Sequence, residues 1–261
     1  MQNHQAAIKE FTLAIELDPK PELYDRRGSA FYSIERFDYA VADYTKAIEL
    51  DPKNPLYLFN RANSYYSMKD YGKAEKDYSQ AILFSSGNSW YYFNRGMVYS
   101  EVGNLQEAIK DFNRAIQLDP RVAKFHNSLG FAYFKMKCYD QALGPFKEAI
   151  QLDTFKAEYY NNRGNALSGL KRYTEALDDY NRAIKLDGSH ADYFNNRGNL
   201  YNVMQNYIKA LEDFNESIRL NGRHYLFFQN RAIIMERLQR YDEAEQDKRK
   251  SEELLQLRKR A

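Results

Sequence analysis

The sequence has few of the residues that would indicate a secreted, membrane-spanning or disordered protein. Cys138 is the single cysteine, so no internal disulfide can form. The apolar runs are only a few residues long, far short of the roughly 20 that cross a bilayer, and the N-terminus lacks the features of a secretory signal. With 6 prolines and 12 glycines in 261 residues, no flexible linker is expected. We therefore expect a soluble protein of a reducing compartment such as the cytoplasm.

Residues of recognised catalytic or metal-binding patterns are also missing. None of the four histidines stands in a recognised metal-binding spacing with another His, Cys or Asp, and no glycine-rich phosphate loop or nucleophile elbow occurs. No base can be assigned to Cys138. The sequence predicts no enzyme activity, no metal and no cofactor.

The charge is nearly balanced, with 38 Lys and Arg against 36 Asp and Glu, a formal net charge of +2. Such a chain has no overall field that would attract nucleic acid or an anionic membrane. Charge therefore disfavours both partners and does not identify another.

What the sequence does contain is a small side chain that recurs every 34 residues, followed seven residues later by a second one. An aromatic residue stands between them in most copies, so three side chains share one helical face. The first column is Ala40, Ala74, Ala108, Ala142, Ala176, Ala210 and Ala244; the aromatic column is Tyr44, Tyr78, Phe112, Phe146, Tyr180 and Phe214.

Upstream of each small column, a second pattern predicts another helix. It carries Tyr24, Leu58, Tyr92, His126, Tyr160, Phe194 and Phe228, each followed four residues later by Gly or Ala. Leu-Asp-Pro, Ser-Gly, Asp-Gly or Asn-Gly then ends most copies, and such residues stop a helix and turn the chain. Each 34-residue unit is therefore a pair of helices.

This pattern resembles the tetratricopeptide repeat, a 34-residue helix-turn-helix unit. The resemblance implies an all-α, right-handed superhelix, or solenoid, of stacked helix pairs. We expect a partial repeat at 1–20, in which Ile8, Phe11 and Ile15 lack a covering helix and the native chain continues upstream. Full repeats are expected at 21–54, 55–88, 89–122, 123–156, 157–190, 191–224 and 225–261, the last with a polar capping helix. Gly144 and Pro145 make 123–156 atypical, and a kink or altered stacking is expected there.

At one position of the repeat, this chain has arginine where the family usually has an apolar residue. An arginine precedes the Gly or Ala, and an aspartate follows it by sixteen residues; repeat four has Leu129 and Pro145 and so lacks both. Their joint absence predicts an ion pair between the two helices, because one member alone would be a buried, uncompensated charge. The alternative is two separately solvated charges. The expected pairs are Arg27–Asp43, Arg61–Asp77, Arg95–Asp111, Arg163–Asp179, Arg197–Asp213 and Arg231–Asp247.

In the family, the first helix of each pair lines an inner groove. Asparagine recurs at the places that this resemblance turns inward, and its amide can match the polar groups of an extended backbone. A similar asparagine ladder lines the groove of O-GlcNAc transferase. The alternative is that these amides only join neighbouring helices. The candidate residues are Asn60, Asn63, Asn94, Asn127, Asn162, Asn165, Asn196, Asn199 and Asn230.

Aromatic residues occupy other inward places in repeats two to four, and exposed rings commonly mark a contact surface. The candidates are Phe59, Tyr66, Trp90, Phe93 and Phe131. Co-chaperones of the family clamp a C-terminal carboxylate with Lys, Asn, Asn, Lys and Arg. Asn63, Asn94 and Lys124 match three of those places, but Phe59 and Ser128 replace the first Lys and the Arg. The sequence therefore predicts that the clamp is absent.

Three functions remain open at this point. The leading one is a scaffold or adaptor that binds an extended peptide or protein in the groove. A second is an assembly module that self-associates through its N-terminal end. The third, binding of single-stranded RNA, is disfavoured by the neutral chain.

Overall fold

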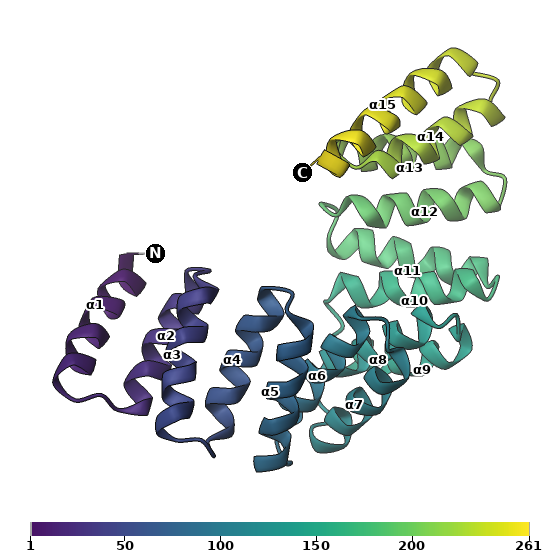
Figure 1. Cartoon of the computed structure of the whole chain (residues 1–261). Coiled ribbons are helices and arrows are strands. Elements are labelled where there is room, and N and C mark those ends of the chain that lie inside the picture. Colours follow the sequence, from purple (N-terminus) through teal and green to yellow (C-terminus); the bar gives the residue numbers. More distant parts are fainter. Residues whose placement is uncertain (1, 261) are drawn as a thin grey trace. The chain divides into compact units, whose positions relative to one another are not determined.

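The computed structural model describes residues 2–260, and in this part of the chain every regular element is a helix. Figure 1 shows the helices following one another as antiparallel hairpins. The chain divides into two compact units, Met1–Ala132 and Tyr133–Ala261.

The first unit begins with the single helix α1 and continues as helix pairs. Its helices are α1 (Gln2–Leu17), α2 (Pro21–Ser33), α3 (Phe37–Leu50), α4 (Pro55–Ser67), α5 (Tyr71–Phe84), α6 (Ser89–Glu101) and α7 (Leu105–Leu118), with most of α8 (Ala123–Lys135). The second unit holds α9 (Tyr139–Leu152), α10 (Ala157–Gly169), α11 (Tyr173–Leu186), α12 (Ala191–Val203), α13 (Tyr207–Leu220), α14 (Tyr225–Arg237) and α15 (Tyr241–Arg260).

Local sequence fixes where these helices begin and how each pair turns. The side chains of Asn54 and Asn88 cap α4 and α6 by accepting hydrogen bonds from the second backbone amide of each helix. Between paired helices one residue adopts the left-handed region, with φ near 61° at Lys69 and 82° at Gly103. A lysine in this conformation is strained, whereas glycine is not.

The small and aromatic columns form the core of each repeat. Ala74 and Ala108 are fully buried, and the rings of Tyr78 and Phe112 lie between paired helices. A Cβ on Gly96 would lie 2.8 Å from the Phe112 ring, so glycine allows the close approach of α6 and α7.

First helices lie on the inner side of each unit. The pairs α2–α4, α4–α6, α10–α12 and α12–α14 approach within 8 Å between Cα atoms. Within either unit's described residues, successive second helices such as α3 and α5, or α11 and α13, have no comparable approach. The shorter spacing places first helices on the concave side.

The N-terminal helix and the fourth full repeat are the less regular parts of the chain. Helix α9 contains Pro145 and is 14 residues long, like α3, α5, α7, α11 and α13, so the proline does not end the helix. At the N-terminal end, Ile8, Phe11 and Ile15 are half-buried, and α1 packs on α2.

Candidate functional site

Six arginines join the helices of their own repeats through paired hydrogen bonds. In each, Nε donates to one carboxylate oxygen of the aspartate sixteen residues later and Nη2 donates to the other, at 2.7–2.9 Å. Burial raises the pKa of the Asp111 carboxyl, while the hydrogen bond and charge of Arg95 lower it. These pairs are part of the scaffold and lie between the helices of a repeat.

Several asparagines of the inner face form hydrogen bonds between successive first helices of this chain. Asn196 Nδ2 donates to Asn161 Oδ1 of the preceding repeat at 2.9 Å, and Asn230 Nδ2 donates to Asn195 Oδ1 at 2.8 Å. Asn60 and Asn94 donate in the same way to Asp25 and Asn63. Each of these four amides therefore uses one N–H to join repeats, and Asn94 also forms a side-chain hydrogen bond with Tyr78. Within the described residues, no hydrogen bond to their Oδ1 atoms is present.

A second group of amides is held by tyrosines of the aromatic column. Tyr78 donates its hydroxyl hydrogen to Asn63 Oδ1 at 2.6 Å, and Tyr180 donates to Asn165 Oδ1 at 2.7 Å. Asn199 occupies the corresponding place above Phe214, which has no hydroxyl, and within residues 2–260 no hydrogen bond of its amide is present. In the described part of the chain, the Asn199 amide can therefore bind another molecule without breaking an internal hydrogen bond.

Two of the residues expected at the contact surface are buried, and that expectation is corrected here. Phe93 is 1 % exposed because its ring packs against Trp90, Phe112 and Phe125. Asn127 is buried as well.

The other expected aromatic residues differ in exposure. Trp90 is 41 % exposed, and Phe131 is also exposed. Phe59 and Tyr66 are half-buried; Phe59 packs against the rings of Tyr78 and Tyr91. Trp90 is supported edge-on by Phe93 and Phe125, and it is one of two large rings, with Phe131, that the first unit's inner helices expose.

A cavity of about 190 Å³ opens on the inner side of the first unit, where candidate residues from successive first helices converge. Lys124 Nζ lies 5.2 Å from the centre of the Phe93 ring, so the cavity has a cation at one margin. Its walls are the rings of three tyrosines and one phenylalanine, two amides and a thioether. They comprise Tyr32, Asn63, Tyr66, Tyr78, Phe93, Asn94, Met97 and Lys124.

The second unit has its own inner cavity, of about 450 Å³, at the N-terminal ends of α10 and α12. It is acidic, with Glu158, Asp187 and Asp192 against Lys156. Hydrogen bonds from the side chain and backbone of Ser189 lower the pKa of the Asp187 carboxyl. This cavity favours a neutral or basic group over an anion.

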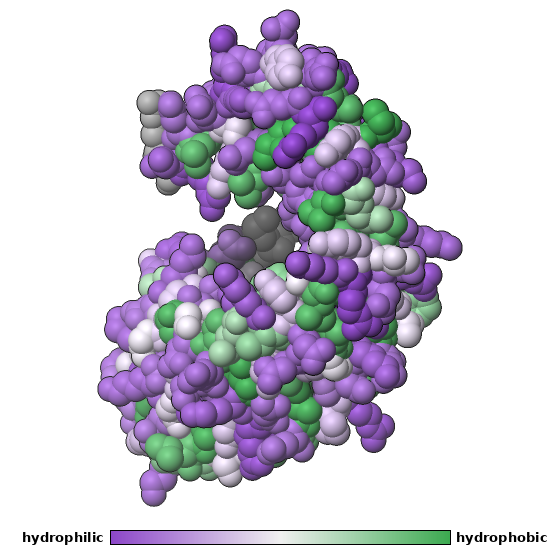
Figure 2. Space-filling view, turned by 90° about the vertical axis from the view of Figure 1, so that its right-hand side faces the viewer, coloured by the Kyte–Doolittle hydropathy of each residue, from purple (hydrophilic) through white to green (hydrophobic). Residues whose placement is uncertain are grey.

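Among residues 2–260, no three His, Cys, Asp or Glu side chains are grouped so as to hold a metal ion. None of the described helices is long and apolar enough to span a bilayer. On the face shown in Figure 2, hydrophilic residues predominate and apolar residues form small separate patches.

Comparison with known proteins adds a family match. A tetratricopeptide repeat model matches residues 55–88, 89–122, 157–190 and 191–224, which together exceed half of the chain, and a second TPR repeat model matches residues 28–69. No curated protein matches this sequence.

Solved structures of similar fold include a tetratricopeptide repeat protein from Parabacteroides merdae, with a TM-score of 0.75, 18 % identity, and coverage of 90 % of this chain and 93 % of that one. Cut9–Hcn1 of the APC/C gives 0.72 at 18 % identity over 89 % of this chain, but only 47 % of that chain's length is spanned. YrrB, described as a TPR protein with an unusual peptide-binding site, gives 0.58 at 27 % identity, covering 70 % of this chain and 95 % of that one.

Proposed function

The chain belongs to the tetratricopeptide repeat family, and we propose that it is a non-catalytic scaffold that binds an extended segment of another protein on the inner face of its first unit. The observation that carries this proposal is the 190 Å³ cavity, because one contiguous surface gathers residues from four first helices. YrrB, at 27 % identity, is described as having a peptide-binding site, which supports the same class of ligand.

The size of the cavity favours a peptide over a small molecule. Sites for small molecules and cofactors usually enclose about 300–1,000 Å³. A volume of about 190 Å³ accommodates one side chain of a longer ligand, whose remaining surface lies along the neighbouring helices.

The residues that line the cavity favour an apolar side chain of the peptide and offer a hydrogen bond to the peptide backbone. Tyr66 and Met97 offer an apolar surface, and methionine adapts its shape to the group that it contacts. Asn94 uses one N–H for Asn63, so its oxygen can accept a hydrogen bond from a peptide amide. Trp90, on the same face of α6, supplies an aromatic anchor for a second apolar side chain.

Trp90 also makes the proposal directly testable, because it is the single tryptophan of the chain. Peptides selected from a displayed library on the immobilised full chain should change the Trp90 fluorescence when they bind. Trp90→Ala should weaken their affinity by about 2 kcal/mol, or roughly 30-fold, as expected for a central aromatic anchor.

Phe155→Ala is the matched control, since Phe155 is an exposed ring in the second unit. It should leave the affinity unchanged, and circular dichroism should show both variants folded. Equal affinity of the parent and Trp90→Ala would place recognition on another surface.

A further inference from the structure

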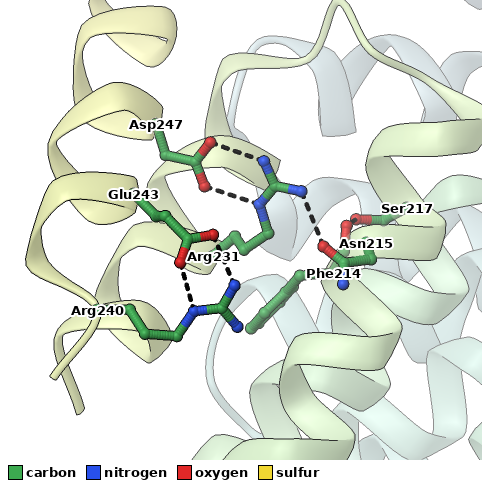
Figure 3. A network of polar contacts seen from close by, with 7 residues as sticks. All are labelled: Phe214, Asn215, Ser217, Arg231, Arg240, Glu243 and Asp247. Carbon is green, nitrogen blue, oxygen red and sulfur yellow. Dashed lines mark hydrogen bonds and ion pairs between the residues drawn. The ribbon is translucent and has the colours of Figure 1, made fainter. Parts of the chain in front are cut away.

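Five of the six arginines in the ion pairs make a third hydrogen bond, which joins their repeat to the preceding one. Nη1 of Arg231 donates to Asn215 Oδ1 at 2.8 Å, so this guanidinium lies between Asp247 and the preceding second helix (Figure 3). Nη1 of Arg197 donates to Asn181 in the same way, at 2.7 Å. In the first unit the acceptors are hydroxyl oxygens, those of Thr12, Thr45 and Ser79.

Arg163 is the exception among the six. It holds Asp179 at 2.7–2.8 Å, but sixteen residues before it stands Lys147, which has no acceptor atom to offer in place of Thr, Ser or Asn. Among the residues that the structure describes, Nη1 of Arg163 therefore makes no third hydrogen bond. The Arg163 side chain is 26 % exposed, whereas the other five are 18–20 % exposed.

A cavity of about 350 Å³ lies at this place, between α9, α10 and α11 of the second unit. Lys147 and Arg163 line it, and Leu143 and Leu167 give it an apolar surface. Arg172 also lines it but is bound to Glu175 by two hydrogen bonds of 2.6–2.7 Å. Among the described residues, Lys147 Nζ and Arg163 Nη1 are thus the cationic donors of this cavity that make no hydrogen bond within the protein, and both are accessible to solvent.

We propose that Lys147 Nζ and Arg163 Nη1 form a binding site for a carboxylate side chain, Asp or Glu, of a partner protein. The carboxylate oxygen occupies the place that Asn181 Oδ1 or Thr45 Oγ1 fills for the other arginines, and it separates the two cations. The methylene stem of the partner residue contacts Leu143 and Leu167. This site shares no residue with the 190 Å³ cavity and is independent of the function proposed for it.

The surrounding charges favour a carboxylate over a phosphate. Glu175, Asp178 and Asp179 line the same cavity, and Asp178 is exposed and forms no ion pair with another described residue. A phosphate carries close to two negative charges at neutral pH, so these three carboxylates repel it more strongly than a singly charged carboxylate. The site therefore selects an acidic side chain rather than a phosphorylated one.

Sodium acetate is the probe, added to the full-length chain and compared with sodium chloride at equal ionic strength. The side-chain NMR signals of Lys147 and Arg163 should shift with acetate and saturate in the millimolar range, but not shift with chloride. Lys147→Thr installs the residue found at Thr45, so it should raise the midpoint of thermal unfolding and weaken the acetate response about tenfold. Asn181→Lys replaces the acceptor of Arg197 by a lysine, as Lys147 does before Arg163. The NMR signal of Arg197 should then also shift with acetate.

Three results would overturn the proposal. The first is a Lys147→Thr protein that responds to acetate as the parent does. The second is an unshifted Arg163 signal in the parent at saturating acetate. The third is stronger binding of inorganic phosphate than of acetate at equal ionic strength, which would assign the site to a phosphorylated group instead.

Discussion

Arg95 of α6 holds Asp111 of α7 through two parallel hydrogen bonds, from Nε to Oδ2 at 2.7 Å and from Nη2 to Oδ1 at 2.8 Å. Asp111 is almost fully buried in this contact. Arg95→Leu should lower the free energy of unfolding by about 3 kcal/mol, because it leaves a buried carboxylate without its cation. Urea denaturation followed by circular dichroism measures this change.

The double variant Arg95→Leu with Asp111→Leu provides the control for that prediction. It removes both charges, as repeat four does with Leu129 and Pro145, and should lose less stability than the single variant. Small and equal losses in the two proteins would mean that solvent screens the pair.

Two asparagines of α12 differ in their internal hydrogen bonds: Asn196 donates to Asn161, whereas no such bond of Asn199 is present among the described residues. Asn196→Ala removes the hydrogen bond to the buried Asn161 and should cost about 1–2 kcal/mol of unfolding free energy. Asn199→Ala removes no internal hydrogen bond and replaces a poorer helix former, so stability should stay within about 0.5 kcal/mol or rise. Thermal unfolding of both variants tests the difference, and a larger loss at Asn199 would contradict it.

The left-handed turn residues allow a test of backbone strain. Lys69 has φ of 61° between α4 and α5, so Lys69→Gly should raise the unfolding free energy by about 1 kcal/mol. Gly103, with φ of 82° in the next repeat, is the reciprocal site, and Gly103→Lys should lower stability by a similar amount. Chemical denaturation of the two single variants would reveal any change of the opposite sign.

Buried tyrosines predict loss of the fold in alkaline solution. Burial raises the pKa of Tyr66 and of Tyr193 to about 12, and it also raises the pKa of Tyr78. These folded-state values lie above the unfolded value of about 10. Their contribution to stability is therefore complete below pH 10 and is lost as the pH rises through 12. Helical circular dichroism and tyrosinate absorbance should change together in that range, and Tyr66→Phe should reduce the loss.

The 34-residue periodicity was sufficient to predict the helix pairs, because several columns hold the same register in every repeat. The sixteen residues between Arg95 and Asp111 recur in the other ion pairs, because the two helices of each repeat pack in the same way. The structure places the two side chains in contact. The sequence columns and the Arg–Asp spacing recur in several repeats, so each repeat supports the structure predicted for the others.

Exposure of individual rings was harder to predict. Trp90 and Phe93 are three residues apart on α6, and both occupy inward places, yet one is 41 % exposed and the other 1 %. The difference depends on how Phe125 of the next first helix stacks on Phe93, which periodicity does not encode. The third hydrogen bond that five of the six arginines make was not predicted either, although four of its acceptors, Thr45, Ser79, Asn181 and Asn215, stand at a constant sixteen residues upstream.

The pairing of Tyr180 with Asn165 means that a core substitution can change the hydrogen-bonding groups offered by the inner face without altering the residues of that face. A phenolic hydroxyl in the second helix occupies the amide oxygen above it, whereas Phe214 leaves Asn199 with its full hydrogen-bonding capacity. Phe214→Tyr would place one oxygen atom in the interior and engage Asn199 from below. The hydrogen-bonding capacity of these amides is therefore set partly by core side chains, and a comparison of surface residues between relatives would overlook it.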